Sequence, residues 1–164
     1  MAGGSDDLPL PDPRVVDLEW IGSGFTSIQR LGTTDDATMP DTADRYFRWL
    51  PRAFRGLVQV RGDARTAEVV LSLAGVPAIR LRTRARAPDG ITFDVVGGAL
   101  ARPGGTFSFV RRRGGGASAV LEGFRPRLPG WLYTRTHGPV HVSVMKHFAA
   151  HLEAPRSEPD AEAP

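Results

Sequence analysis

Four histidines lie late in the chain, at His137, His141, His147 and His151. They form two pairs with i, i+4 spacing, which on a helix brings both imidazoles to one side, as a metal site requires. No HExxH motif is present and no carboxylate lies between the histidines, so a third ligand is missing. We therefore expect no metal site, and we expect no cofactor.

His141 is the histidine whose position best suits chemistry. Residues 139–152 are predicted to form a helix, because apolar residues recur at every fourth position from Val140 to Leu152. His141 falls inside this apolar stripe. Because imidazole titrates near neutrality, it could act there as an acid, a base or a hydrogen-bonding group for a ligand. The alternative is a core histidine that a neighbouring group satisfies.

Other kinds of chemistry find less support in the residues. The chain has no cysteine, which excludes a thiolate nucleophile and a thiolate zinc site. The glycines at 97–98 and 114–116 lack the GxxxxGK[ST] pattern of a phosphate loop and are interpreted as turn or bulge glycines. Several polar residues inside predicted strands would touch a ligand only if they faced a cavity, and Asp94 is expected to face solvent. They are Thr83, Thr92, Asp94, Ser108 and Ser118.

Arginines alternate with other residues along segment 78–86, and alternation is the pattern of a strand with one wet face. The sequence predicts that Arg80, Arg82, Arg84 and Arg86 share that face. The whole chain carries +3, but residues 1–20 carry −4 and residues 153–164 carry −3, which leaves +10 for the body between them. An anionic partner such as RNA, a ribosome or a lipid surface is one interpretation. Solvent-facing arginines from a GC-rich coding bias are the other, and the lack of interleaved aromatic residues disfavours RNA. We expect no DNA binding.

The rest of the chain has mainly the period of strands. Residues 15–22 and 25–32 are either a hairpin or a loose lead followed by one strand. A helix is predicted over 43–50, capped by Asp41 or Thr42, with Pro51 ending it or starting a second short helix. Tight turns separate the remaining predicted strands, which are 56–62, 66–75, 78–86, 91–98, 106–113 and 117–124.

The length of 164 residues favours one domain, which we place at 15–153. The acidic, proline-broken segments 1–14 and 154–164 are expected to be disordered. The N-terminal segment does not have the pattern of a signal peptide and no apolar run approaches 18 residues, so we expect a cytoplasmic protein that does not span a membrane. Strands with two helical regions indicate an α+β fold.

Segments 50–73, 91–110 and 120–153 resemble, in their pattern, the START-like (SRPBCC) superfamily, which includes polyketide cyclases and coenzyme-Q-binding proteins. The resemblance implies a helix-grip fold, in which a curved antiparallel sheet of about six to seven strands wraps around a long C-terminal helix. It also implies a cavity between sheet and helix that holds a lipid, a quinone or a polycyclic aromatic molecule. The superfamily has no universal catalytic set to carry over.

The sequence thus predicts a protein that binds a hydrophobic small molecule, as a carrier or as a cyclase-like enzyme. The alternatives are an interaction protein that uses the arginine face and a structural module whose cavity is filled. Beside His141, the expected cavity residues are Phe47, Trp49, Leu81, Thr83, Phe93, Phe107, Phe109, Trp131, Tyr133, Val144, Met145 and Phe148.

Overall fold

The computed structural model describes residues 15–21, 24–32, 37–127 and 143–153. The predictions for the two acidic tails, 1–14 and 154–164, lie outside the described residues. Those for His137, His141, Trp131 and Tyr133 do so as well.

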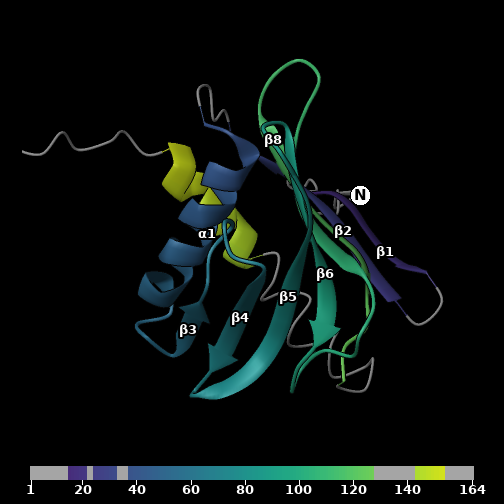
Figure 1. Cartoon of the computed structure of the whole chain (residues 1–164). Helices are drawn as coiled ribbons and strands as arrows, with labels where there is room; N and C mark the ends of the chain where they lie inside the picture. The colour runs from purple at the N-terminus through teal and green to yellow at the C-terminus, as the bar shows by residue number, and fades with distance from the viewer. Residues whose placement is uncertain (1–14, 22–23, 33–36, 128–142, 154–164) are drawn as a thin grey trace, which may run out of the picture.

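Eight strands form one antiparallel sheet in the order β1-β2-β8-β7-β6-β5-β4-β3 (Figure 1). This α+β architecture, with a curved antiparallel sheet, confirms the predicted class. The count exceeds the predicted six to seven because segments 15–21 and 24–31 form a true hairpin. The strands are β1 (Val15–Ile21), β2 (Gly24–Leu31), β3 (Val58–Arg61), β4 (Glu68–Leu73), β5 (Val76–Ala87), β6 (Gly90–Gly97), β7 (Thr106–Arg111) and β8 (Ala117–Phe124).

Helix α1 runs from Met39 to Ala53, which is earlier and longer than the predicted helix. Its N-cap is Thr38 and not Asp41 or Thr42. The Thr38 Oγ1 accepts from the backbone N–H of Asp41 at 3.3 Å, and the Thr38 backbone N–H donates to the Asp41 carboxylate at 3.3 Å, which together close a capping box. The two side chains also bond directly, at 2.7 Å. Pro51 lies in the last turn of α1 and neither ends the helix before it nor starts a second one.

A second helix covers residues 143–153 and is called the C-terminal helix below. The long C-terminal helix expected from the sequence is therefore not present among the described residues. Met145 and Phe148 of the predicted apolar stripe are buried, and Val144 and Leu152 are half-buried. Ala149, which lies outside the predicted stripe, is buried as well. The C-terminal helix lies beside α1, and the Trp49 and Phe148 rings meet at 5.4 Å (Figure 1). Neither described helix is both long and apolar enough to cross a lipid bilayer.

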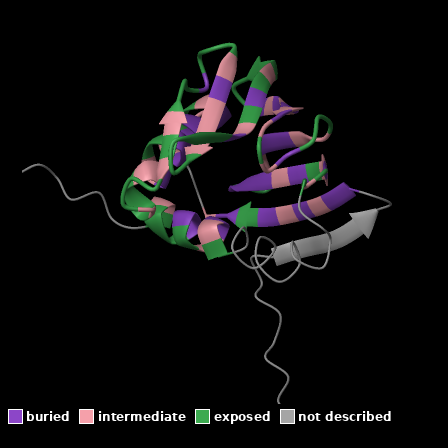
Figure 2. Cartoon of the chain, turned by 90° about the horizontal axis from the view of Figure 1, so that it is seen from below, coloured by how far each residue is buried: buried purple, intermediate pink, exposed green. Residues whose placement is uncertain are grey.

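The core lies between the two helices and the concave face of the sheet. Every second residue of β6 is buried, and β7 and β8 add further buried positions beside them. Figure 2 shows the resulting bands of buried residues across the sheet. Phe93, Phe107 and Phe109 lie in neighbouring strand positions, because Phe93 pairs with Phe107 across β6 and β7. Tyr46 of α1 packs on Phe107 and Phe109 with ring centroids 5.7 and 5.5 Å away. Phenylalanines of the sheet thus hold α1 in place.

The glycines at 97–98 end β6, in agreement with their interpretation as bulge or turn residues. Gly98 has a φ of +141° and comes so close to the backbone of Ala78 that an added Cβ would collide with the Ala78 carbonyl. The next residues then continue along β5, where the Leu100 N–H donates to the same carbonyl at 3.0 Å. Only glycine fits this close approach.

Candidate functional site

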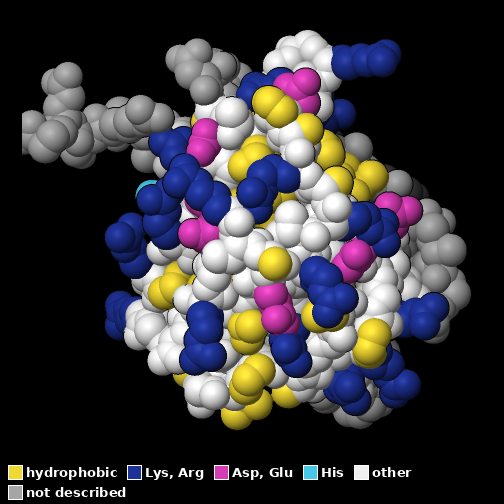
Figure 3. All heavy atoms as spheres, viewed as in Figure 1, with side chains coloured by type: hydrophobic (Ala, Val, Ile, Leu, Met, Phe, Trp, Pro, Cys, Tyr) yellow, Lys and Arg dark blue, Asp and Glu magenta, His cyan; other side chains and the backbone are white. Residues whose placement is uncertain are grey.

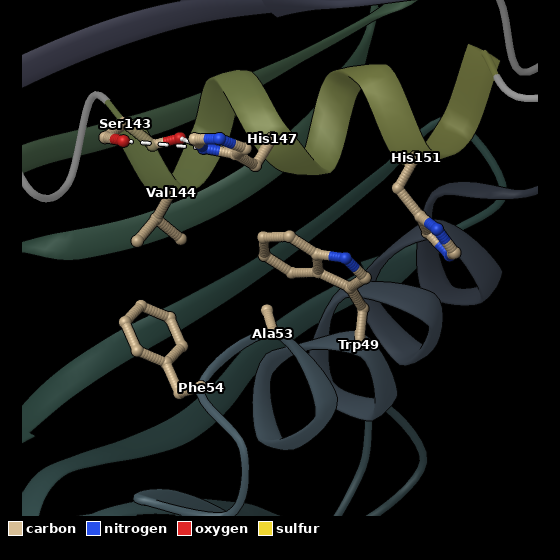
Figure 4. Close-up of a pocket in the computed structure, with 7 residues that line it drawn as sticks. All are labelled: Trp49, Ala53, Phe54, Ser143, Val144, His147 and His151. Atoms are coloured by element: carbon tan, nitrogen blue, oxygen red, sulfur yellow. Dashed lines mark hydrogen bonds between the residues drawn. The ribbon is translucent and has the colours of Figure 1, made fainter.

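A groove of about 600 Å³ lies between the end of α1 and the C-terminal helix. Figure 4 shows the Trp49 indole in the middle of the groove, with Val144 and Phe54 facing each other at one end and His151 at the other. Ala53 completes the α1 side, and its small side chain leaves the groove open. A volume of this size falls in the range of pockets that hold small organic ligands, which is about 300–1,000 Å³.

Two imidazoles border the groove on the C-terminal helix. The Nδ1 of His147 lies 2.7 Å from the Ser143 carbonyl oxygen, and because a carbonyl only accepts, Nδ1 carries the proton. This leaves Nε2 of the neutral ring as an acceptor. His151 lies against Trp49 with ring centroids 6.3 Å apart and planes 30° apart. The groove therefore combines apolar walls with two groups that hydrogen-bond or move protons.

A second, much smaller cavity of about 90 Å³ lies where the resemblance implies the ligand, between α1 and the concave face of the sheet. Aliphatic and aromatic side chains line it, among them Phe47, Leu81 and Phe107. This volume lies well below the range of about 300–1,000 Å³ that is typical of ligand pockets, so a lipid or a quinone does not fit into it as it stands.

Tyr46 gives the small cavity its one unusual polar group. The side chain lines the cavity, the residue is 6% exposed, and its hydroxyl has no hydrogen-bond partner among the described residues. Burial raises the pKa of Tyr46, so the phenol stays protonated and acts as a neutral donor. Most buried hydroxyls in proteins are bonded, so an unbonded one marks a place for a water or a ligand atom.

The residues expected to line one cavity are divided among several places. Phe47, Leu81 and Phe107 line the small cavity, whereas Trp49 and Val144 line the groove. The Thr83 hydroxyl donates to the Thr66 carbonyl at 2.9 Å and is thereby engaged with a loop. The others that the structure describes are buried in the core and line neither space, namely Phe93, Phe109, Met145 and Phe148.

Sequence analysis did not identify several groups that the structure places at these sites. Tyr46 is not among the site residues that the sequence predicts, and His147 and His151 enter there only as possible metal ligands. Their i, i+4 spacing was the available signal, since it puts both on one side of the helix. Among the described residues, no cluster of three or more histidine or acidic side chains could hold a metal ion.

A buried polar pair was also missed. Gln29 Nε2 donates to Ser27 Oγ at 3.3 Å, and both residues are almost fully buried. They pair with Ala119 and Leu121 across β2 and β8, which places them on the core side of the sheet. A strand with polar residues at 27 and 29 gives no sequence signal for this, because the alternation predicts that polar side chains face solvent.

The arginine face differs from its prediction at one end. Arg80 and Arg84 form ion pairs with Glu68 at 2.8 Å and Asp94 at 2.7 Å. A register shift between Thr83 and Ala85 then reverses the alternation, so that Arg86 pairs with the buried Ile91 instead of continuing the outer stripe. The four arginines therefore do not share one face, and acidic neighbours already partner two of them.

No family model matches the chain, and no curated protein matches it in sequence.

Proposed function

We propose that the protein binds an apolar small molecule in the groove under its C-terminal helix. The observation that carries the proposal is a space of about 600 Å³ with aromatic and aliphatic walls and two imidazoles at its border. Such a site buries a flat or chain-like apolar body against Trp49, Phe54 and Val144. The imidazoles would then bond one oxygen of the ligand.

A lipid, a quinone or a polyketide-like molecule has the required chemistry, because each combines a large apolar body with a few oxygen atoms. The START-like resemblance supports the same class of ligand. The groove differs from the cavity that the resemblance implies, because it lies between two helices and not against the sheet.

Carrier and cyclase-like enzyme remain two forms of this proposal. A carrier releases its ligand unchanged, whereas a cyclase would use an imidazole to move a proton to or from the bound ligand. His147 suits that role, because the Ser143 carbonyl holds its Nδ1–H and leaves Nε2 as the basic atom. The arginine-face alternative has weaker support, since two of its four members are ion-paired.

The experiment compares two alanines on the helices. Ala53→Phe places a ring inside the groove, whereas Ala150→Phe adds the same ring at an exposed position of the C-terminal helix outside the groove lining. Binding of decylubiquinone and of cis-parinaric acid is measured by fluorescence titration. We expect at least a tenfold loss of affinity for the bound probe in Ala53→Phe and no change in Ala150→Phe. Equal binding by both variants and the unaltered protein would exclude the groove as the site.

Native mass spectrometry of the protein purified from its own host, followed by extraction, then identifies the molecule that occupies the groove. A His147→Ala variant distinguishes the two forms of the proposal. If the protein is a carrier, the only effect of this substitution is weaker binding of an oxygen-bearing ligand. For an enzyme it abolishes turnover of the extracted molecule.

A further inference from the structure

Among the described residues, three large aliphatic side chains are exposed, and they lie together at one end of the molecule. Leu57 is 53% exposed, Leu73 is 38% exposed and Val76 is 54% exposed. Leu73 and Val76 are direct partners across β4 and β5, and the Ala74 N–H donates to the Leu57 carbonyl at 2.9 Å. We call these three residues the apolar tip. Figure 3 shows hydrophobic side chains reaching the surface at this lower end, where β4 ends and β5 begins in Figure 1.

The local backbone holds the apolar tip out from the sheet. Ala74 and Gly75 form a two-residue turn in which both φ angles are positive, at 49° and 82°. Such a turn is the tightest way to join two antiparallel strands, so the side chains beside it stand at the extreme end of the hairpin. Folded chains rarely gather exposed aliphatic groups at one place, and where they do, the patch usually contacts a partner.

The charges around the apolar tip indicate which partner fits. Segments 51–60 and 69–79 contain no acidic residue, and their only charged residues are Arg52 and Arg55. Both arginines are exposed, and neither forms an ion pair with any residue that the structure describes. Aliphatic side chains flanked by arginines are suited to the surface of an anionic bilayer. The aliphatic side chains enter the boundary of the acyl chains, and the arginines bind the lipid phosphates.

We propose that the apolar tip docks the protein on an anionic lipid bilayer. A protein partner is the weaker interpretation, because a stable protein interface takes about 20–30 residues a side, whereas three aliphatic side chains and two arginines form this patch. A bilayer needs no complementary shape and accepts a small patch of this kind.

The apolar tip also adjoins the groove. Phe54 lines the groove, and the Leu57 N–H donates to the Phe54 carbonyl at 2.9 Å. A docked bilayer would therefore lie beside one end of the groove. If the proposed ligand binding holds, this arrangement would let an apolar molecule pass between membrane and groove, but docking itself does not depend on it.

Vesicle flotation tests the proposal with the whole chain. Vesicles of phosphatidylcholine alone are compared with vesicles that contain about one third phosphatidylglycerol. We expect the protein to float with the anionic vesicles only. Leu73→Ser combined with Val76→Ser should lower the partition coefficient at least tenfold. Arg52→Gln combined with Arg55→Gln should lower it about 25-fold at low salt, at about fivefold per arginine.

Arg112→Gln combined with Arg113→Gln is the matched control, because it removes the same charge at the β7–β8 turn, which lies at the other end of the sheet. Its partition should change less than twofold. Absence of binding to anionic vesicles would overturn the proposal, and so would equal loss in both arginine pairs. A concentration-dependent dimer that the Leu73 and Val76 substitutions abolish, without vesicle binding, would instead assign the tip to a second copy. Thermal melting of each variant confirms that it is folded.

Discussion

Replacement of Tyr46 by phenylalanine should make the protein more stable. The ring of Tyr46 contacts Phe107, Phe109 and Phe148 at centroid distances of 5.1–5.7 Å, and a phenylalanine keeps all of these contacts. Only the hydroxyl is lost, and among the described residues it has no partner. Burying an unbonded hydroxyl costs about 1–3 kcal/mol, so its removal should raise the free energy of unfolding by about 1 kcal/mol.

The assay is thermal and urea unfolding of the purified protein, followed by circular dichroism. A gain of about 1 kcal/mol corresponds to a rise of roughly 2–4 °C in Tm for a chain of this size. Ser108→Ala is the control, because the Ser108 hydroxyl is also buried but donates to the Thr92 Oγ1 at 3.0 Å. Its loss should lower stability by about 1 kcal/mol.

The two substitutions should therefore act in opposite directions. If Tyr46→Phe lowers stability as Ser108→Ala does, the reasoning is refuted, because the Tyr46 hydroxyl must then have a bonding partner in the folded protein. The small cavity has room for a few waters, and a water bonded to the Tyr46 hydroxyl would produce that result.

Three further substitutions or conditions follow from the hydrogen bonds and the titrating groups. The free energy of unfolding should fall above pH 10 in unfolding titrations, because burial raises the pKa of Tyr46 in the folded state while the unfolded chain loses the tyrosine proton there. Tyr46→Phe should reduce this dependence of stability on pH. Asp44→Ala should lower the free energy of unfolding by about 2 kcal/mol in urea melts, since it leaves the buried Ala64 N–H, now bonded at 2.6 Å, without its acceptor. Thr38→Ala should cost about 1 kcal/mol by thermal melting, because it opens the capping box of α1; a variant as stable as the parent would show that the cap contributes nothing.

The strands were predictable because alternation is a local property. Segment 91–98 was expected as a strand and β6 runs from Gly90 to Gly97, with every second side chain buried. The same alternation predicts that the side chains of Phe107 and Phe109 face one side of the sheet, and both are buried. The register shift at Thr83 was not predictable, since the sequence keeps alternating through it and only the pairing with β6 shows the extra residue.

The start of α1 was missed for a different reason. The predicted helix begins only at residue 43, although Thr38 and Asp41 have the spacing of a capping box and Pro40 suits the first turn. The groove was beyond local patterns altogether. It depends on how α1 packs against a helix that begins about ninety residues later in the chain, and the periodicity of a single segment does not predict such long-range packing.

One turn of α1 connects the two spaces of the protein. Tyr46 lines the small cavity and Trp49, three residues later, lines the groove, and their rings lie 6.4 Å apart. Phe148 of the C-terminal helix touches both rings, at 5.1 Å and 5.4 Å. A ligand that presses on Trp49 therefore presses on an aromatic cluster that continues into the core. Because packed aromatic cores resist local deformation, this aromatic cluster gives the groove a rigid wall, to which both helices contribute.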